Sequence, residues 1–376
     1  MIRIVVKIGS SLVASLDSEI GLNLERINSL ALDIAGAIKS GYQVVVVSSG
    51  AVAAGRKKLG LTRKDLNIMY KQAAAAIGQT GLINAYEQSF QEHGHRVAQI
   101  LLTGNVIADR LRYVNARNTI LTLLSLGVIP IINENDSVAV DEIKFGDNDN
   151  LAAIVSGLID AHMLVILSDV DGLYSKNPNE DISARLIANI PKVDNKIKAI
   201  AGDSGNAVGT GGMFSKVLAA QKATGYGIPV VIMSGRKQGL LCRLLDGESI
   251  GSFFEPVKKR LCSRKRWIAH GINEKGIVVI DEGAAKAVTE QGKSLLPTGI
   301  LAVRGQFKIG DSICCISLQG ETVARGITNY SSEDLAKIKG EKSNRIESIL
   351  GYKYSDEVIH RDNLVLDDLT LKSDFS

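Results

Sequence analysis

The stretch IRIVVK, residues 2–7, is an apolar run that ends in a lysine, and it predicts a strand buried on both faces. Similar runs follow along the chain, with helical stretches between them: VVVV (44–47), VAQILL (97–102), VIPII (128–132), MLVIL (163–167) and PVVIM (229–233). Buried strands that alternate with helices indicate crossover connections. Residues 1–255 are therefore expected to form an α/β domain, a mainly parallel sheet sandwiched by helices.

The composition changes after this domain. The segment PVKKRLCSRKRWIAH (256–270) carries six Lys or Arg residues and no acid, so residues 256–273 are interpreted as a basic linker. Short runs with turn glycines then predict a smaller β-rich domain over 274–352: GIVVIDEGA (276–284), GILAVRG (299–305), DSICCISL (311–318) and ETVARGITN (321–329). The tail, 353–376, is charged and is expected to pack loosely.

The overall composition excludes several classes of protein. The 44 basic and 40 acidic residues give a net charge of only +4, so no global field selects a polyanionic partner. The four cysteines, Cys242, Cys262, Cys314 and Cys315, lack CxxC spacing, which argues against a zinc site or a disulfide framework and fits a reducing cytosol. No apolar run is long enough for a signal peptide or a membrane span. A cytoplasmic protein is expected.

Glycines, hydroxyls and lysines occur where a parallel sheet collects its ligands, beyond the strands. Glycine turns let backbone amides wrap phosphate oxygens, and a lysine one turn into the following helix reaches the same charge. The segments are Lys7-Ile8-Gly9-Ser10-Ser11, Ser48-Ser49-Gly50, Ser168-Asp169 and Gly209-Thr210-Gly211-Gly212-Met213-Phe214-Ser215-Lys216. Together they predict a phosphate site at one edge of the sheet.

Each of these segments alone is more often a plain loop, and a single lysine at a strand end is usually solvated. Their joint occurrence along one edge favours the phosphate site. Two better-known nucleotide motifs do not fit. The chain has no GxxxxGK[ST] segment, and GxGxxG fails because Phe214 stands at its sixth position.

Acids and amides cluster in two further segments, Asn133-Glu134-Asn135-Asp136 and FGDNDN (145–150). FGDNDN has three interpretations: a metal loop, a cap for the apolar LAAIVSGLI that follows, or half of a substrate site. The metal loop is the weakest, because nothing after Asp147 fits the glycine and glutamate of an EF-hand. Carboxylates with amides complement the ammonium and carboxylate of an amino acid, so a kinase acting on an amino acid is the leading hypothesis.

The order of the motifs resembles that of the glutamate 5-kinases, a family with the amino acid kinase fold and a C-terminal PUA domain. The segments that carry the resemblance are VVKIGSS, VVSSGAVAAGR, LLTGNVIADRLRYVNARNT, PIINENDSVA, FGDNDNLAA, LSDVDGLY, AGDSGNAVGTGGMFSK and SRKRWI, and the similarity runs from residue 2 to about residue 363. The resemblance implies ATP-dependent phosphorylation of the side-chain carboxylate of L-glutamate to L-glutamyl 5-phosphate, the first step of proline biosynthesis.

The resemblance also implies roles for individual residues. Lys7 and Lys216 would sit on the transferring phosphoryl group, and Asp149 would orient both lysines. Glutamate would be held by Ser49, Gly50, Asn133, Asp136, Asp147 and Asn148. The nucleotide would be held by Lys7, Gly9, Ser168, Asp169, Thr210, Gly211, Gly212, Met213, Phe214, Ser215 and Lys216, with backbone amides of Gly9 and Gly50 on the phosphates. Family members commonly carry Thr where this chain has Ser168, and the hydroxyl is kept.

The resemblance implies ATP and Mg²⁺, with the ion carried mainly by the nucleotide and no protein metal ligand. It also implies a homo-oligomer and free proline as feedback inhibitor. PUA domains bind RNA in other proteins, but the domain after Trp267 is close to charge balance, so we expect no RNA binding here. Two alternatives stay open: an RNA-binding protein with a vestigial kinase domain, and a kinase of the same fold with another acidic substrate.

Overall fold

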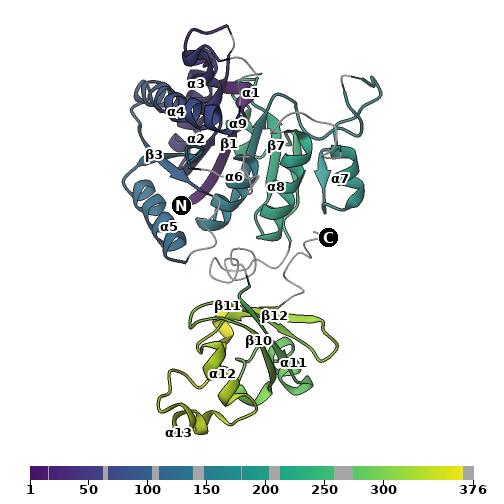
Figure 1. The fold of residues 1–376 in the computed structure, drawn as a ribbon. Coiled ribbons are helices and arrows are strands. Elements are labelled where there is room, and N and C mark those ends of the chain that lie inside the picture. Colours follow the sequence, from purple (N-terminus) through teal and green to yellow (C-terminus); the bar gives the residue numbers. More distant parts are fainter. Residues whose placement is uncertain are drawn as a thin grey trace. The chain divides into compact units, whose positions relative to one another are not determined.

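The computed structural model describes residues 1–15, 17–61, 67–103, 110–138, 148–178, 180–202, 212–257 and 274–366. The chain divides into two compact units, an N-terminal one within residues 1–257 and a C-terminal one within 274–366. Each unit has its own sheet and its own apolar core (Figure 1). No helix in these ranges is both long and apolar enough to cross a bilayer.

The N-terminal unit is built on an eight-stranded sheet with the order β3-β4-β2-β1-β5-β7-β8-β6. All six strands predicted from the sequence are present and parallel, which confirms the mainly parallel α/β fold. The strands are β1 (Ile2–Ile8), β2 (Tyr42–Ser48), β3 (Arg96–Leu102), β4 (Val128–Glu134), β5 (Met163–Ser168), β6 (Asn189–Ile190), β7 (Val230–Ser234) and β8 (Ser252–Phe254). The short β8 runs antiparallel to β7, and β6 pairs with β8.

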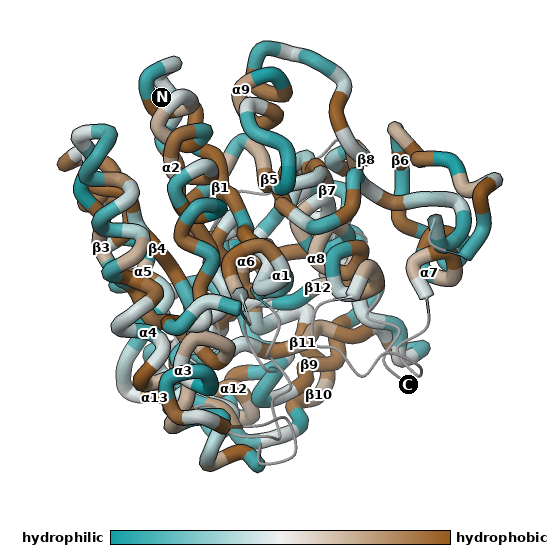
Figure 2. Tube along the Cα trace, turned by 90° about the horizontal axis from the view of Figure 1, so that it is seen from above, coloured by the Kyte–Doolittle hydropathy of each residue, from teal (hydrophilic) through white to brown (hydrophobic). Residues whose placement is uncertain are grey.

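Helices cover both faces of this sheet. Figure 2, seen from above, separates α2 and α9 on one side of the strands from α6 and α8 on the other. The helices are α1 (Ser10–Val13), α2 (Leu24–Lys39), α3 (Ala51–Leu59), α4 (Ile68–Gln91), α5 (Arg110–Ser125), α6 (Asn148–Leu158), α7 (Asn195–Ala201), α8 (Met213–Gly225) and α9 (Leu240–Leu245). Side chains alternate along a strand, so Ile4, Val6 and Ile8 of β1 enter the core formed with α2 and α4. Lys7 therefore faces the α6 side.

Helices α3 and α4 cross in very close contact because glycines stand at the crossing. A Cβ atom on Gly55 would lie 1.7 Å from the carbonyl oxygen of Ala74, and one on Gly78 would lie 1.8 Å from that of Ala51. No side chain can replace either glycine without moving a helix. The crossing fixes α4 against the first turn of α3, which follows directly from the Ser48-Ser49-Gly50 segment.

The order of the strands creates a switch point in the middle of the sheet. From β1 the chain continues to β2 on one side, whereas β5 and β7 lie on the other side. In open α/β sheets the crevice outside the carboxyl ends of the strands at such a point is where ligands bind. Lys7 and Gly9 at the end of β1 and Ser168 at the end of β5 border this position.

The C-terminal unit contains a five-stranded sheet with the order β10-β9-β11-β12-β13. Its strands are β9 (Gly276–Ile280), β10 (Ile300–Gly305), β11 (Ser312–Ile316), β12 (Thr322–Ile327) and β13 (Leu364–Leu366). Its helices are α11 (Glu282–Thr289), α12 (Ser332–Ile338) and α13 (Ile346–Leu350), with short 3₁₀ turns at Pro297–Gly299, Ser343–Arg345 and Arg361–Asn363. All four strands predicted in this domain are present.

Two sequence predictions for the C-terminal unit are wrong. The strand predicted over 276–284 ends at Ile280, because the Asp281 carboxylate accepts the Ala284 N–H at 2.7 Å and caps α11. The expected loose packing of the tail is wrong up to residue 366. Strand β13 pairs with β12, and Val358 and Ile359 are fully buried, because apolar residues among the charged ones complete the core of this unit.

Candidate functional site

Two lysines and one aspartate meet at the carboxyl edge of the large sheet. Lys7 comes from β1, Asp149 from the first turn of α6 and Lys216 from the first turn of α8, and all three are at least 95% buried. Asp149 accepts on both oxygens: Lys7 Nζ pairs with Oδ1, and Lys216 Nζ lies 3.3 Å from Oδ2. Ser215 donates its hydroxyl to Oδ2 at 2.8 Å. Helices α6 and α8 lie side by side, so their first turns can share this contact (Figure 1).

Opposing influences act on the Asp149 carboxyl group. Burial alone would raise its pKa, but the ammonium groups of Lys7 and Lys216, with hydrogen bonds from Lys7 and Ser215, lower the pKa below its ordinary value. The carboxylate is therefore charged at neutral pH. Two ammonium groups and one carboxylate leave a net charge of +1 in a buried cluster, which attracts an anion such as a phosphoryl group.

A second group of contacts ties three segments together beside this cluster. The Asn148 amide nitrogen, Nδ2, lies within hydrogen-bond distance of the Ser48 carbonyl at 3.1 Å, the Ser49 hydroxyl at 2.8 Å and Asn133 Oδ1 at 2.9 Å. Asn133 in turn donates from Nδ2 to Gln79 Oε1 at 2.7 Å. The ends of β2 and β4 and the start of α6 are thus held in one polar network, directly next to Asp149 in sequence.

Asp136 lies in the turn after β4, at the same edge of the sheet. Burial raises the pKa of its carboxyl group. A positive charge placed beside this carboxyl group would lower its pKa again and stabilise the carboxylate form.

The segments expected to hold a nucleotide flank the lysine cluster on the β5 side. Ser168 is buried and donates to the neighbouring Asp169 carboxylate at 3.1 Å. Helix α8 begins at Met213, and its N-cap residue, Gly212, has no side chain to cap the first N–H groups, so this helix start is suited to an anion. Phe214 and Ser215 lie half-buried in this first turn.

The backbone conformation at position 50 requires a glycine. Its φ of +112° lies in the left-handed region, and a Cβ atom would lie 2.7 Å from Val13 Cγ2. The Gly9 N–H, expected to face a phosphate, instead donates to the Leu167 carbonyl at 3.3 Å. That bond joins the ends of β1 and β5 and engages this amide within the sheet edge.

Comparison with known proteins identifies the family. The model of the amino acid kinase family matches residues 3–234, and the model of the PUA domain matches residues 276–350. The glutamate 5-kinase of Geobacter sulfurreducens is 50% identical to this chain over 364 residues, covering 97% of both chains. That of Syntrophotalea carbinolica is 49% identical over 364 residues, again with 97% of each chain covered. The chain belongs to the glutamate 5-kinase family.

Solved structures give a weaker likeness. An isopentenyl phosphate kinase superimposes with a TM-score of 0.49 at 18% identity, over 67% of this chain and 99% of that chain.

The fold of this glutamate 5-kinase relative brings together residues that lie far apart in the sequence. Lys7, Asp149, Ser215 and Lys216 form the charged cluster, and Ser49, Asn133 and Asn148 form the amide network. Asp136, Ser168, Asp169, Gly212, Met213 and Phe214 lie at the same sheet edge. Asp147, Thr210 and Gly211 lie outside the described residues.

Sequence reasoning missed Gln79. It stands on α4 within the run AAAAIGQ, keeps only 9% of its surface exposed and accepts from Asn133. A single amide in a run of small apolar residues is a usable signal, because a buried amide needs a hydrogen-bond partner.

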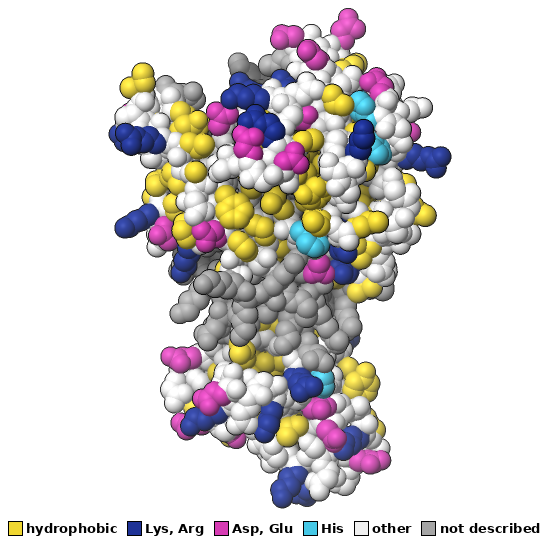
Figure 3. Space-filling view, turned by 180° about the vertical axis from the view of Figure 1, so that it is seen from behind, with side chains coloured by type: hydrophobic (Ala, Val, Ile, Leu, Met, Phe, Trp, Pro, Cys, Tyr) yellow, Lys and Arg dark blue, Asp and Glu magenta, His cyan; other side chains and the backbone are white. Residues whose placement is uncertain are grey.

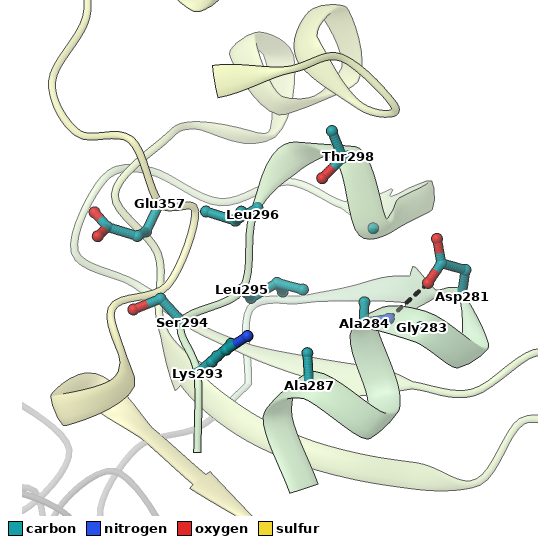
Figure 4. A pocket seen from close by; sticks show the side chains of 11 residues that line it. Asp281, Gly283, Ala284, Ala287, Lys293, Ser294, Leu295, Leu296, Thr298 and Glu357 are labelled. Atoms are coloured by element: carbon teal, nitrogen blue, oxygen red, sulfur yellow. Dashed lines mark hydrogen bonds between the residues drawn. The ribbon is translucent and has the colours of Figure 1, made fainter. Parts of the chain in front are cut away.

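The PUA unit has a separate pocket of about 420 Å³. Figure 4 shows that α11 and the segment from Lys293 to Thr298 line it, with Glu357 at the rim. Asp281, the only other acid there, is engaged in capping α11. Lys293, Ser294 and Thr298 also line the pocket, and its remaining lining residues are glycine, alanine or leucine.

Charge is mixed on the surface of the PUA unit. On the face seen in Figure 3, lysines and arginines of this unit are interspersed with acids. Among the described residues on this face, the cations are not gathered into the kind of cluster that binds a phosphate backbone.

Proposed function

We propose that this protein transfers the γ-phosphoryl group of ATP to the side-chain carboxylate of L-glutamate, forming L-glutamyl 5-phosphate for proline biosynthesis. The observation that carries the proposal is the Lys7–Asp149–Lys216 cluster, buried at the switch point of the sheet and adjacent to the amide network of Asn148. A cationic phosphoryl site beside an amino-acid site is the arrangement the reaction needs.

The chemistry demands little more than placement and charge. The attacking carboxylate is ionised at neutral pH, because an ordinary glutamate side chain has a pKa of about 4.3, so no general base is required. One of its oxygens forms a bond to the γ-phosphorus while the bond to the bridging oxygen of ADP breaks. We assign Lys7 and Lys216 to the charge that spreads over the equatorial oxygens in this step, and Asp149 to holding both ammonium groups in place.

Glutamate is assigned to the amide side of the cluster. Asp136 is half-buried with a raised pKa, so pairing with the substrate ammonium would stabilise its carboxylate form. Ser49, Gly50, Asn133, Asp147 and Asn148 complete this half of the site in our proposal.

The nucleotide is assigned to the β5 and α8 side, with Ser168, Asp169 and the segment from Thr210 to Lys216. Gly9 would border the phosphates without donating its N–H, which the Leu167 carbonyl engages. Magnesium would be held mainly by the nucleotide's phosphates, where it lowers their negative charge. This assignment fits the donors present, since the buried carboxylate of Asp149 is already engaged by two lysines and Ser215.

The finer points of organisation are also proposals. We assign catalysis to residues 1–255 and a structural or regulatory role to the PUA domain at 274–352, with 256–273 as linker and 353–376 as tail. We expect a cytoplasmic homo-oligomer that free proline inhibits, without RNA binding. Light scattering tests the homo-oligomer, and a titration of the activity with proline tests the inhibition. RNA retention at physiological salt tests whether the protein binds RNA.

Hydroxylamine trapping tests the function. Acyl phosphates react with hydroxylamine to give hydroxamates, so ATP, magnesium and glutamate should yield a coloured iron complex. Aspartate and N-acetylglutamate serve as alternative acidic substrates. Product with glutamate alone supports the proposal, whereas no glutamate-dependent product, or a faster reaction with another acid, would overturn it.

A further inference from the structure

Gln79 is a buried polar residue that the proposed reaction does not use directly. It lies in the middle of α4, and its Oε1 accepts the Asn133 Nδ2 at 2.7 Å in a fully buried contact. Seven residues further along the same helix, Tyr86 shares a 2.8 Å hydrogen bond with the Ser48 hydroxyl. Residues seven apart lie on one face of a helix, so α4 holds the ends of both β4 and β2.

The register of the sheet places these two anchor points side by side. Strands β2 and β4 pair Val47 with Ile132, so Ser48 and Asn133 follow one residue further along each strand. Asn148 at the start of α6 bonds to both of them, through the Ser48 carbonyl and Asn133 Oδ1. The position of Asn148 thus depends on a pair of groups that α4 fixes from behind.

The amides in this chain have a defined direction. Asn148 donates to Asn133 Oδ1, which also accepts the Glu134 N–H at 2.9 Å, and Asn133 donates to Gln79. Because the Glu134 backbone N–H can only donate, Asn133 presents its oxygen to Glu134 and Asn148, and its nitrogen points to Gln79, whose oxygen holds it there. Asn148 then presents its nitrogen inward, and its Oδ1 is left buried without a partner among the described residues. An oriented acceptor of this kind suits an ammonium donor.

We propose that Gln79 is a positioning residue for the amino-acid half of the site. Together with the Glu134 N–H it anchors the amide of Asn133 and, through it, directs Asn148 Oδ1 toward the ammonium group of the substrate. The inference rests on the proposed function. Without the Gln79 acceptor, the Asn133 nitrogen is left buried without the partner that anchors it to α4, so the Asn133 amide is held less firmly and glutamate binding weakens, while the lysine cluster that acts on ATP is untouched.

The test compares substitutions that keep or remove the acceptor. Gln79→Met keeps the length of the side chain and removes the acceptor, whereas Gln79→Glu keeps an oxygen for Asn133. Gln88→Met, at an exposed position on the same helix, controls for the substitution itself. The Michaelis constants for glutamate and ATP and the turnover number are measured for each variant. A KM does not depend on how much of the enzyme is folded, so the KM of a poorly folding variant can still be compared with that of the wild type.

In Gln79→Met the KM for glutamate should rise about tenfold, the effect of losing one neutral hydrogen bond. The KM for ATP and the turnover number should stay within about threefold of wild type, and Gln79→Glu should restore most of the affinity for glutamate. A glutamate KM in Gln79→Met equal to that of Gln88→Met would overturn the inference, as would equal rises in both KM values. If Gln79→Met has no activity, the test rests on Gln79→Glu. A glutamate KM raised about tenfold in Gln79→Glu contradicts the proposal, and a glutamate KM close to that of the wild type supports it. The wild type is measured alongside. If it forms no glutamate-dependent product, the proposed function is wrong, whereas an active wild type means that the variants test the role of Gln79 alone.

Discussion

Replacing Asp149 with asparagine removes one charge from the centre of the site and changes almost nothing else in shape. Asp149 is completely buried, and its two oxygens pair with Lys7 and Lys216. In Asp149→Asn both ammonium groups stay buried and lose the counter-charge that Asp149 provides. We therefore expect a large loss of stability as well as of turnover.

The size of the loss follows from the contact distances. At an effective dielectric constant of about 20, opposite charges 3.3 Å apart, as for Lys216 Nζ and Asp149 Oδ2, attract by about 5 kcal/mol. The burial of the charges offsets part of this attraction in the wild type. Removing one partner from a buried ion pair typically lowers the free energy of unfolding by about 3–5 kcal/mol, and we expect a loss in that range at pH 7.

The loss should depend on pH in a defined direction. The pKa of Asp149 is lowered in the folded protein, so its charge contributes stability above the unfolded carboxyl pKa of about 3.9. That contribution disappears as the pH falls through the lower folded pKa, and asparagine has no such titration. The difference in the free energy of unfolding between wild type and Asp149→Asn should therefore have its largest value at pH 7 and shrink below about pH 4.

Urea unfolding followed by circular dichroism measures this difference, with Asp17→Asn as the control at an exposed position of the same unit. Asp149→Asn should unfold at much lower urea than the control at pH 7. A variant as stable as Asp17→Asn at pH 7, or a difference that does not shrink on acidification, would refute the reasoning.

The other predictions concern turnover, packing and pH. Lys216→Ala and Lys7→Ala should each lower the turnover number by about 10²–10³, or about 2.7–4 kcal/mol, because each removes a preorganised cation; near-normal turnover would refute the role. Gly78→Ala should lower the free energy of unfolding by at least about 1–3 kcal/mol, because its Cβ would lie 1.8 Å from a carbonyl oxygen. Gly81→Ala on the same helix is the control: its Cβ would meet only the Lys58 side chain, so this variant should be neutral or stabilising. Equal melting temperatures for the two variants would contradict the prediction. The pKa of Asp136 is raised by burial, so kcat/KM for glutamate should begin to fall on acidification at a higher pH than an ordinary aspartate would cause. Asp136→Asn should raise the KM for glutamate and abolish this pH dependence. If kcat/KM of the variant fell on acidification as in the wild type, Asp136 would not be the group that binds the substrate ammonium.

The sheet was predictable because its signals are local. Uninterrupted apolar runs mark each of the six parallel strands, and lysines, glycines and acids stand at their carboxyl ends. Once the strands are parallel, these ends must meet at one edge. The short β6 and β8 and the tail strand β13 carry no such pattern, because two or three residues depend on their neighbours for pairing.

Contacts between distant segments could not be predicted from patterns alone. Asn148 reaches Ser49 across 99 residues, and Gln79 reaches Asn133 across 54. The sequence indicates which residue types gather at the edge, but the direction of the amides and the position of α4 behind them arise from packing. The stretch FGDNDN, expected as cap, metal loop or substrate site, supplies Asn148 to the amide network and Asp149 to the lysines.

The central claim is that the side-chain carboxylate of glutamate attacks ATP at this site. The most direct measurement uses glutamate whose side-chain carboxylate carries oxygen-18, with the product trapped by hydroxylamine. In the attack one carboxylate oxygen becomes the bridge to phosphorus, and hydroxylamine then displaces phosphate from the carbonyl carbon. The phosphate released should therefore contain one oxygen-18 atom from glutamate, as mass spectrometry can record. Phosphate free of the label would mean that ATP is split without attack by this carboxylate, and would contradict the account.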